Sequence, residues 1–355
     1  MTMTPMTHRL VLAICLCFLA FSEARVTFDA SEVLDQSDIN ENNTAPFECP
    51  NGCRVYTPTS ATLKIVDEEW TVVISFADLN ARAIDNPLEL EPGNYSVAND
   101  ALGDPPEFIL YVVQKGADNY NAKVYTSAQT ISTNDRYITV LTDLPGMRLN
   151  GIGGDIKDYK PAVYAAGADS ENKCKPVFQS RSFDNAQRTS VAILGPIASI
   201  DFGTDKYTHF VTFNYDYLTG PTNELGSSTV VVTPGYTGCG NDKVFTKEYD
   251  NGFKIDTEYK LSSDKEIALT FTADYSIAAD TPPVEITIND DVIRLEDSGS
   301  TERDFVATEM WVFFDWTRAA DDKKSNFAIQ IDNLLKSGTG LGLAHIVVIA
   351  VFVVR

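Results

Sequence analysis

The chain has 355 residues, of which 28 are Lys or Arg and 50 are Asp or Glu, so its formal net charge is -22. With 44% hydrophobic residues it can bury a core, which excludes wholesale disorder. The negative charge repels nucleic-acid phosphates and anionic lipid heads and argues against both as partners, and the length predicts two domains.

Residues 1–24 are predicted to be a secretory signal peptide. Arg9 precedes an apolar run over residues 10–21, and Ser22-Glu23-Ala24 supplies small residues for cleavage. The run is shorter than the roughly 20 residues that a spanning helix needs. The alternative, a buried N-terminal helix, fits these features less well, so we expect the mature chain to begin at Arg25.

Residues 25–46 are acidic and polar and show no periodic apolar pattern, so we expect a flexible, exposed leader. Two sequons follow in polar stretches, Asn42-Asn43-Thr44 and Asn94-Tyr95-Ser96. Asn42 and Asn94 are therefore predicted to be N-glycosylated.

From residue 47 onward, short runs rich in Val, Ile, Thr, Phe and Tyr alternate with Gly, Pro, Asn and Asp clusters, which is the pattern of strands and turns. Between the terminal segments, no window keeps apolar residues at helical spacing for several turns. The predicted strands are 70–76, 107–114, 122–127, 137–141, 189–194, 197–202, 209–215, 228–233, 244–249, 253–261, 267–271, 284–288, 292–295 and 306–314.

The fold class is therefore predicted as all-β, with two antiparallel β-sandwich units at residues 47–180 and 181–333. The glycine-rich residues 146–174 indicate a long connection. Asp250-Asn251-Gly252 predicts a hairpin turn between the strands at 244–249 and 253–261.

Four cysteines remain after removal of the signal peptide: Cys49, Cys53, Cys174 and Cys239. An even number in a secreted chain predicts two disulfides, and three pairings exist. Proximity favours Cys49 with Cys53, which leaves Cys174 with Cys239. The alternative, a zinc site, lacks a second close Cys pair.

Histidine is scarce, because only His209 lies between the two terminal segments. This excludes a site with two His ligands, and no Gly-x-Ser-x-Gly motif is present to offer a serine nucleophile. His209 is interpreted as an ordinary strand residue. A pair of carboxylates, as in glycosidases, stays open as an alternative, but no pair can be nominated from so acidic a sequence.

Residues 202–276 resemble the second half of a CUB domain. The motifs that carry the resemblance are Tyr215-Asp216-Tyr217-Leu218-Thr219-Gly220-Pro221, Leu225-Gly226, Cys239-Gly240 and Leu269-Thr270-Phe271-Thr272-Ala273-Asp274-Tyr275-Ser276. The resemblance implies an extracellular, jelly-roll-type β-sandwich that binds a partner, with Asp216 and Asp274 as calcium ligands. Phe213 and Asn214 stand where the family has a cysteine, so the usual local disulfide is missing.

Residues 334–355 are predicted to form a glycosylphosphatidylinositol attachment signal. Residues 341–354 are apolar and end one residue before the terminus, which is short for a spanning helix. Ser337-Gly338-Thr339 is the small-residue triplet, so Ser337 or Gly338 is the predicted lipid attachment site. A spanning tail or a core strand are the alternatives.

These features together predict a non-catalytic, lipid-anchored glycoprotein on the extracellular face of the plasma membrane, which it reaches by the secretory pathway. Its expected partner is an extracellular protein or glycan, and its expected role is adhesion, binding or surface defence. The alternative is a secreted polysaccharide hydrolase that uses two carboxylates. A structural coat component is a third interpretation.

Overall fold

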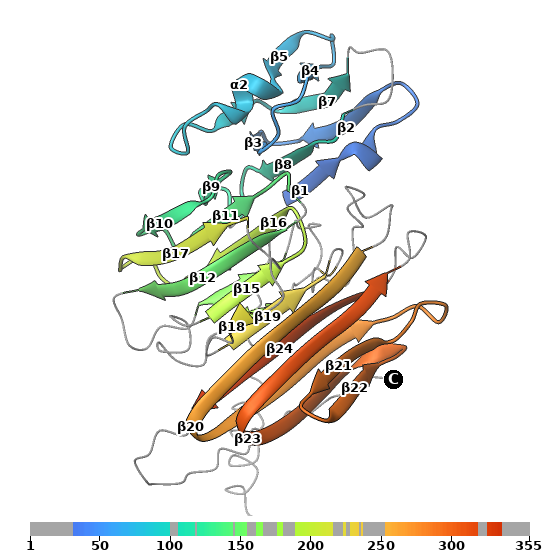
Figure 1. The fold of residues 1–355 in the computed structure, drawn as a ribbon. Coiled ribbons are helices and arrows are strands. Elements are labelled where there is room, and N and C mark those ends of the chain that lie inside the picture. Colours follow the sequence, from blue (N-terminus) through green and yellow to red (C-terminus); the bar gives the residue numbers. More distant parts are fainter. Residues whose placement is uncertain are drawn as a thin grey trace, which may run out of the picture.

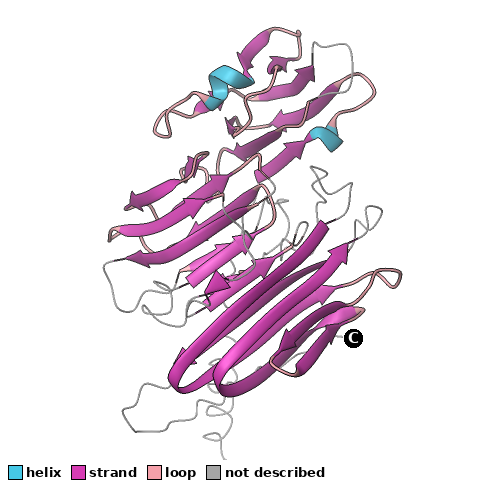
Figure 2. Cartoon of the chain, viewed as in Figure 1, coloured by secondary structure: helices cyan, strands magenta, loops and turns pink. Residues whose placement is uncertain are grey.

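The computed structural model is built almost entirely of β-strands, arranged as stacked sheets (Figures 1 and 2). It describes residues 31–99, 106–117, 119–144, 146–154, 161–165, 176–179, 189–215, 223–224, 228–233, 236, 253–318 and 325–335, with the backbone alone at 37, 223–224, 228, 253–267, 307–318 and 333–335. The prediction of an all-β fold is confirmed. The signal peptide, residues 336–355 of the predicted C-terminal tail with Ser337 and Gly338, and the strand at 244–249 lie outside the described residues; residues 334–335 of that tail end the last strand.

The first sandwich consists of two four-stranded antiparallel sheets. The first sheet has the order β2-β7-β4-β5 and the second sheet has the order β1-β8-β3-β6. The elements are β1 (Ser31–Asp35), a 3-10 turn (Gln36–Asp38), β2 (Thr44–Cys49), β3 (Cys53–Tyr56), β4 (Leu63–Asp67), β5 (Val72–Ser75), α2 (Phe76–Asn80), β6 (Leu88–Leu90), β7 (Gly93–Asn99) and β8 (Ile109–Gln114). Of the described helices, none is long and apolar enough to cross a bilayer.

The Cys49–Cys53 disulfide connects the two sheets of the first sandwich. Cys49 ends β2 in the first sheet and Cys53 begins β3 in the second, so the chain changes sheets between them. Gly52 makes this change of direction at φ 89, a conformation that glycine adopts without steric cost. Both cysteines are fully buried, and the predicted pairing is confirmed.

The second sandwich contains a five-stranded third sheet and a larger fourth sheet. The third has the order β14-β13-β16-β11-β9 and the fourth has the order β10-β17-β12-β15-β19-β24-β20-β23-β21-β22, with β18 beside β20. The first part comprises β9 (Lys123–Tyr125), β10 (Gln129–Thr133), β11 (Tyr137–Leu141), β12 (Met147–Gly154), β13 (Ala162–Tyr164), β14 (Phe178–Gln179), β15 (Thr189–Ile193), β16 (Ile197–Asp201), β17 (His209–Asn214) and β19 (Ser228–Val232). The remainder comprises β18 (Asn223–Glu224), β20 (Phe253–Ser276), β21 (Val284–Ile288), β22 (Asp291–Leu295), β23 (Ser298–Arg318) and β24 (Asn326–Leu335).

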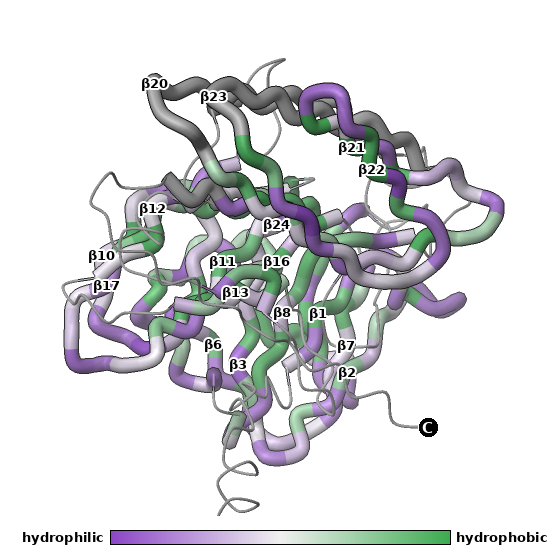
Figure 3. The backbone as a smooth tube through the Cα atoms, turned by 90° about the horizontal axis from the view of Figure 1, so that it is seen from below, coloured by the Kyte–Doolittle hydropathy of each residue, from purple (hydrophilic) through white to green (hydrophobic). Residues whose placement is uncertain are grey.

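The two sandwiches are joined face to face, because the second and third sheets bury both of their faces. In β8, Leu110 and Val112 pack into the first sandwich, whereas Ile109, Tyr111 and Val113 pack against the third sheet. This is why β8 has a continuous apolar sequence instead of alternating polar and apolar residues. In Figure 3 the inner strands around the labels β8, β1 and β16 accordingly show long hydrophobic stretches.

The junction also contains buried polar groups. The amide nitrogen of Asn119 donates to the Tyr111 hydroxyl at 2.8 Å. Burial raises the pKa of Tyr111 to about 12, although hydrogen bonds with Ser31, Thr139 and Asn119 act in the opposite direction. Nearby, Arg54 donates to Glu89 and lies 4.3 Å from the ring centroid of Tyr120. These contacts fix the segment that connects the two sandwiches.

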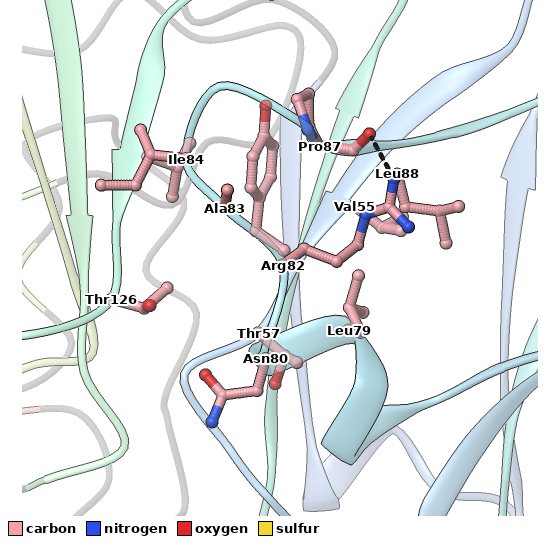
Figure 4. Close-up of a pocket in the computed structure, with 12 residues that line it drawn as sticks. Val55, Thr57, Leu79, Asn80, Arg82, Ala83, Ile84, Pro87, Leu88 and Thr126 are labelled. Atoms are coloured by element: carbon pink, nitrogen blue, oxygen red, sulfur yellow. Dashed lines mark hydrogen bonds between the residues drawn. The ribbon is translucent and has the colours of Figure 1, made fainter.

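A small pocket lies beside this junction, between the first sandwich and the end of β9 (Figure 4). Val55, Leu79 and Ile84 line it together with Thr126, and Arg82 points its guanidinium towards the Pro87 carbonyl. Its volume of about 30 Å³ is room for about one or two water molecules. It is therefore a packing gap and has no space for an organic ligand.

Part of the apolar face of the fourth sheet is covered by the sheet's own end strands, β21 and β22. The long strand β20 pairs with β23 on one side and β24 on the other, and β21 and β22 fold back beyond β23. Residues of β21 and β22 then share a core with β20 and β24; these are Leu269, Phe271, Val284, Ile286, Ile293, Leu295, Ile329 and Ile331. The predicted strands at 253–261 and 267–271 are thus one continuous strand.

Three predictions about organisation are wrong. The expected leader contains β1 and the start of β2, where Val33 and Leu34 are buried, because a short strand with few apolar residues can still complete a sheet. The expected connection at 146–174 contains β12 and β13. The boundary near Ser180 falls inside the second sandwich, since β13 pairs with β16 and β12 with β15; the change of sandwich occurs between β8 and β9.

Candidate functional site

The turn between β4 and β5 places an exposed tryptophan at the outer edge of the first sheet. The carboxylate of Asp67 accepts hydrogen bonds from the backbone N–H groups of Glu69 at 2.9 Å and Thr71 at 2.8 Å. The N–H of Trp70 donates to the carbonyl of Asp67 at 3.0 Å. This closed turn leaves Trp70 at φ 61, in the left-handed region.

Trp70 is an unusual residue for that conformation. Among the described residues, the other non-glycine residues with positive φ are Asn43, Asn289 and Asp297, whose short polar side chains tolerate it. A bulky residue there costs about 1–2 kcal/mol. Burial does not offset this cost, because 65% of the Trp70 surface is exposed. Folding alone therefore does not explain a tryptophan at this position, and strain of this kind often accompanies a functional site.

Two exposed valines continue the apolar surface along β5. Val72 is 52% exposed and Val73 is 38% exposed, because an irregular register opposite Ile65 and Val66 displaces the strand. In the described sheet β5 is the edge strand. We name residues 70–73 the Trp70 ridge. The prediction of a strand over residues 70–76 is partly wrong, since α2 begins at Phe76 with Ser75 as its N-cap.

Trp70 also lines a hollow on the outer face of the first sheet, which we name the Asn94 hollow. Its volume is about 360 Å³, within the size range of ligand pockets. Its lining residues are Pro46, Phe47, Glu48, Val66, Asp67, Glu68, Trp70, Asn94, Tyr95 and Ser96. The side-chain nitrogen of Asn94 donates to Glu68 Oε1 at 2.7 Å. The hollow thus combines an aromatic ring, carboxylates and an amide.

Two carboxylates of the Asn94 hollow, those of Asp67 and Glu68, already hold structural hydrogen bonds. Asp67 organises the turn, and Glu68 accepts from Asn94. Three acidic side chains, Glu48, Asp67 and Glu68, make the hollow negative and disfavour an anionic ligand.

Of the two residues predicted as calcium ligands, one is described by the structure. Asp216 lies outside the described residues, and Asp274 on β20 accepts a hydrogen bond from the Tyr236 hydroxyl at 3.0 Å. Among the described side chains, no group of three or more potential ligands is assembled. The carboxylate of Asp201, an acidic residue just upstream of the CUB-like motifs, is held by Arg136 and by the N–H of Gly203. Calcium binding by Asp216 and Asp274 therefore stays a prediction.

The other predicted site residues lie in both sandwiches. Asn42 is in an exposed turn before β2, and Asn94 is exposed on β7. Glycosylation of both stays a prediction, and Cys174 and Cys239 lie outside the described residues. His209 is buried on β17, with its ring stacked on Phe202 at 4.5 Å between centroids, which agrees with its interpretation as a strand residue.

Sequence reasoning missed the Trp70 ridge because the run Trp70-Thr71-Val72-Val73 has the aromatic and β-branched residues that are typical of a strand. A signal was present in the acidic residues that precede it. Asp at the first position of a turn favours closure through its own carboxylate, and the residue that ends such a turn often has positive φ. That reasoning leads to Trp70, where Gly or Asn is expected.

No model of a known protein family matches the chain, and no curated protein matches its sequence. A search of solved structures aligns it with the CUB1-EGF-CUB2 domains of rat MASP-1, at 9% identity and a TM-score of 0.22, over 57% of this chain and 96% of that one. Salicylate 1,2-dioxygenase from Pseudaminobacter salicylatoxidans aligns at 8% identity and a TM-score of 0.12, over 58% of this chain and 68% of that one. The first alignment names the family that residues 202–276 resemble, but the likeness is weak, and neither score carries an argument about function.

Proposed function

We propose that the protein is a non-catalytic glycoprotein, anchored by lipid at the extracellular face of the plasma membrane, that binds an extracellular protein through the Trp70 ridge. The observation that carries this proposal is Trp70 itself. Its backbone is strained and its indole is largely exposed, so the residue contributes little to folding.

The chemistry of the ridge favours a protein partner. Tryptophan is among the residues most enriched at the energetic centres of protein interfaces, and an edge strand with exposed valines offers adjoining apolar surface. Exposed Glu68 and Glu69 lie beside Trp70, and the whole chain carries a charge of -22. The partner is therefore expected to have an apolar contact with a basic rim.

The hydrogen bonds in the hollow support a binding role over hydrolysis. A glycosidase needs one carboxyl group free to donate a proton and a second free to attack or to activate water. In the Asn94 hollow, Asp67 holds the turn and Glu68 holds the Asn94 amide. Two of the three carboxylates thus serve the structure of the site, which leaves Glu48 alone where hydrolysis needs a pair.

The compartment is proposed from the sequence signals at both ends and from the disulfide. Disulfides persist in oxidising compartments, and Cys49–Cys53 is buried and bonded. The lipid anchor is tested by treating intact expressing cells with phosphatidylinositol-specific phospholipase. Release of the protein is expected. If the protein instead stays on the cells after this treatment, but is released when residues 334–354 are deleted, a spanning tail is favoured.

The binding surface is tested by placing a photo-crosslinking amino acid at position 73, in the Trp70 ridge, on cells that display the full chain. Val292 of the second sandwich is 51% exposed and provides the matched control position. We expect a discrete crosslinked protein from position 73 and none from position 292. Equal crosslinking from both positions, or adducts with glycans only, would contradict the proposal.

A further inference from the structure

The sequon Asn94-Tyr95-Ser96 lies in the wall of the Asn94 hollow, opposite the turn that carries Trp70. All three sequon residues line the hollow, and so does Trp70. Asn94 is exposed on β7, where it pairs with Glu48 of β2, and Ser96 pairs with Pro46 of β2 and with Val66 of β4. A group attached to the Asn94 amide would therefore start inside a hollow of about 360 Å³.

We propose that Asn94 carries an N-linked glycan and that its first sugar is seated in the Asn94 hollow against the indole of Trp70. This inference rests on the proposed function in one respect, since the chain must enter the secretory pathway. The Trp70 ridge stays available to a partner along Val72 and Val73, which do not line the hollow.

The attachment chemistry is compatible with the contacts of Asn94. The amide nitrogen attacks the anomeric carbon of an N-acetylglucosamine held on a lipid diphosphate donor; the bond from that carbon to the phosphate oxygen breaks, the diphosphate leaves with the electron pair, and the nitrogen loses one proton. An amide nitrogen carries two hydrogens, so one remains after the reaction. That hydrogen can keep the bond to Glu68 Oε1, which orients the attached sugar.

The lining of the hollow suits a neutral sugar. The C–H groups of a pyranose ring carry partial positive charge and pack on the negative face of an indole. Carboxylate oxygens accept hydrogen bonds from sugar hydroxyl and acetamido groups, and Glu48 supplies such oxygens beside Asn94.

Asn42 provides an internal comparison. Its sequon lies in the exposed turn before β2, and neither Asn42 nor Thr44 lines the Asn94 hollow. A glycan on Asn42 has no contact with Trp70 to gain from this hollow. Comparing the two sites therefore distinguishes the effect of carrying a glycan, which both share, from the effect of a sugar that contacts Trp70, which is expected at Asn94 alone.

The test uses the full chain expressed in cultured cells with its glycans kept in the high-mannose form and then trimmed enzymatically to a single N-acetylglucosamine. Peptide mass spectrometry measures occupancy of both sites. Thermal melting is then compared for the unaltered chain, Ser96→Ala, Ser96→Thr and Asn42→Gln, each with Trp70 present and with Trp70→Gly. Ser96→Ala removes the sequon and keeps the Asn94 amide, whereas Ser96→Thr keeps the sequon.

We expect occupancy at Asn94, and a melting temperature lowered by about 2 °C by Ser96→Ala when Trp70 is present. We expect the same change to have no effect in the Trp70→Gly background, and Ser96→Thr to match the unaltered chain. Asn42→Gln should change the melting temperature by the same amount with Trp70 present and with Trp70→Gly.

Three outcomes would overturn the inference. Occupancy at Asn42 without occupancy at Asn94 would remove the glycan and leave the proposed function intact. An effect of Ser96→Ala that is equal with and without Trp70 would show that the sugar is not seated. Absence of glycan from both sites would contradict the inference and the secretory route together.

Discussion

In the first sandwich the outer sheet leaves Trp70, Val72 and Val73 exposed beside a hollow, whereas in the second sandwich the outer sheet buries much of its apolar face beneath β21 and β22. Both sandwiches are built from the same kind of alternating strands, and both share the junction around Tyr111. The two sandwiches differ in their outer sheets, the ones that face away from the junction: one leaves apolar side chains exposed there, and the other buries them.

The second sandwich buries the apolar surface of its outer sheet within the fold. It extends β20 and β23 well beyond the length of the other strands and folds a hairpin back over the exposed side. Its partly buried charges are paired inside the fold, as in Arg136 with Asp201. Against that background, the strained and exposed Trp70 of the first sandwich is the feature that points to recognition.

The largest expected effect tests whether the two sandwiches are one unit. Burial favours the neutral form of Tyr111 and raises its pKa to about 12 from the usual 10.0. The stability that follows from this shift is fully present below pH 10 and is lost as the pH rises towards 12, in total roughly 3 kcal/mol. Chemical denaturation between pH 8 and pH 12 should show this loss as one transition for both sandwiches.

Tyr111→Phe is the control for this prediction. It removes the ionisable hydroxyl, so the variant should lose less free energy of unfolding at alkaline pH than the parent does. Burial also raises the pKa of Tyr56, so some loss of stability at alkaline pH is expected to remain in the variant. Two separate transitions at neutral pH would show that the sandwiches unfold independently.

The second prediction concerns the disulfide, which is confined to the first sandwich. Replacing both Cys49 and Cys53 with Ala should lower the free energy of unfolding by about 2 kcal/mol, because the closed loop is short and the entropy that it removes from the unfolded chain is modest. Denaturation of the oxidised protein and the double variant measures it. The control is Cys53→Ala compared with the reduced parent, a change that alters a side chain but breaks no disulfide. If the double variant loses no more free energy of unfolding than this control does, the disulfide contributes nothing and the account is contradicted.

The third prediction sharpens the contrast at Trp70. Trp70→Gly should raise the free energy of unfolding of glycan-free protein by about 1 kcal/mol, because glycine adopts positive φ without the steric cost. Trp70→Ala keeps the strain and should give no such gain. Thermal melting of the two variants side by side is the measurement. Neither variant carries the indole, so a lower melting temperature for Trp70→Gly than for Trp70→Ala would show that the positive φ at position 70 does not strain the fold.

The smallest expected effect lies in the second sandwich. Asp274→Asn keeps an oxygen that accepts from the Tyr236 hydroxyl, so it should change stability by less than about 0.5 kcal/mol. The melting temperature of both proteins should be the same with calcium and with a chelator. Stabilisation of the parent by calcium that disappears in Asp274→Asn would contradict this expectation and support the calcium site implied by the CUB resemblance.

Strands with clear alternation could be predicted from the sequence, and those at 137–141 and 284–288 match the structure at both ends. The β12 strand could not, because its glycines resemble a loop. Gly153 is needed inside that strand because the ring of Phe210 occupies the space that a Cβ atom would take. Such a contact between strands distant in sequence leaves no local signal.

The site was only partly predictable for a similar reason. Asn94 and the Cys49–Cys53 pair follow from local motifs. The placement of Asn94 beside Glu68 and Trp70 depends on the pairing of β7 with β4, which the sequence does not specify. The positive φ of Trp70 depends in turn on closure of the β4–β5 hairpin.

The measurement that tests the central claim most directly is the affinity of the full chain for the partner crosslinked at position 73, compared between the parent and Trp70→Gly. If Trp70 is kept for recognition, the dissociation constant should rise by about thirtyfold, as expected for the centre of an interface, while the variant melts no lower than the parent. The matched variant Val292→Asp, in the second sandwich, should bind like the parent. Unchanged affinity in Trp70→Gly would contradict the account.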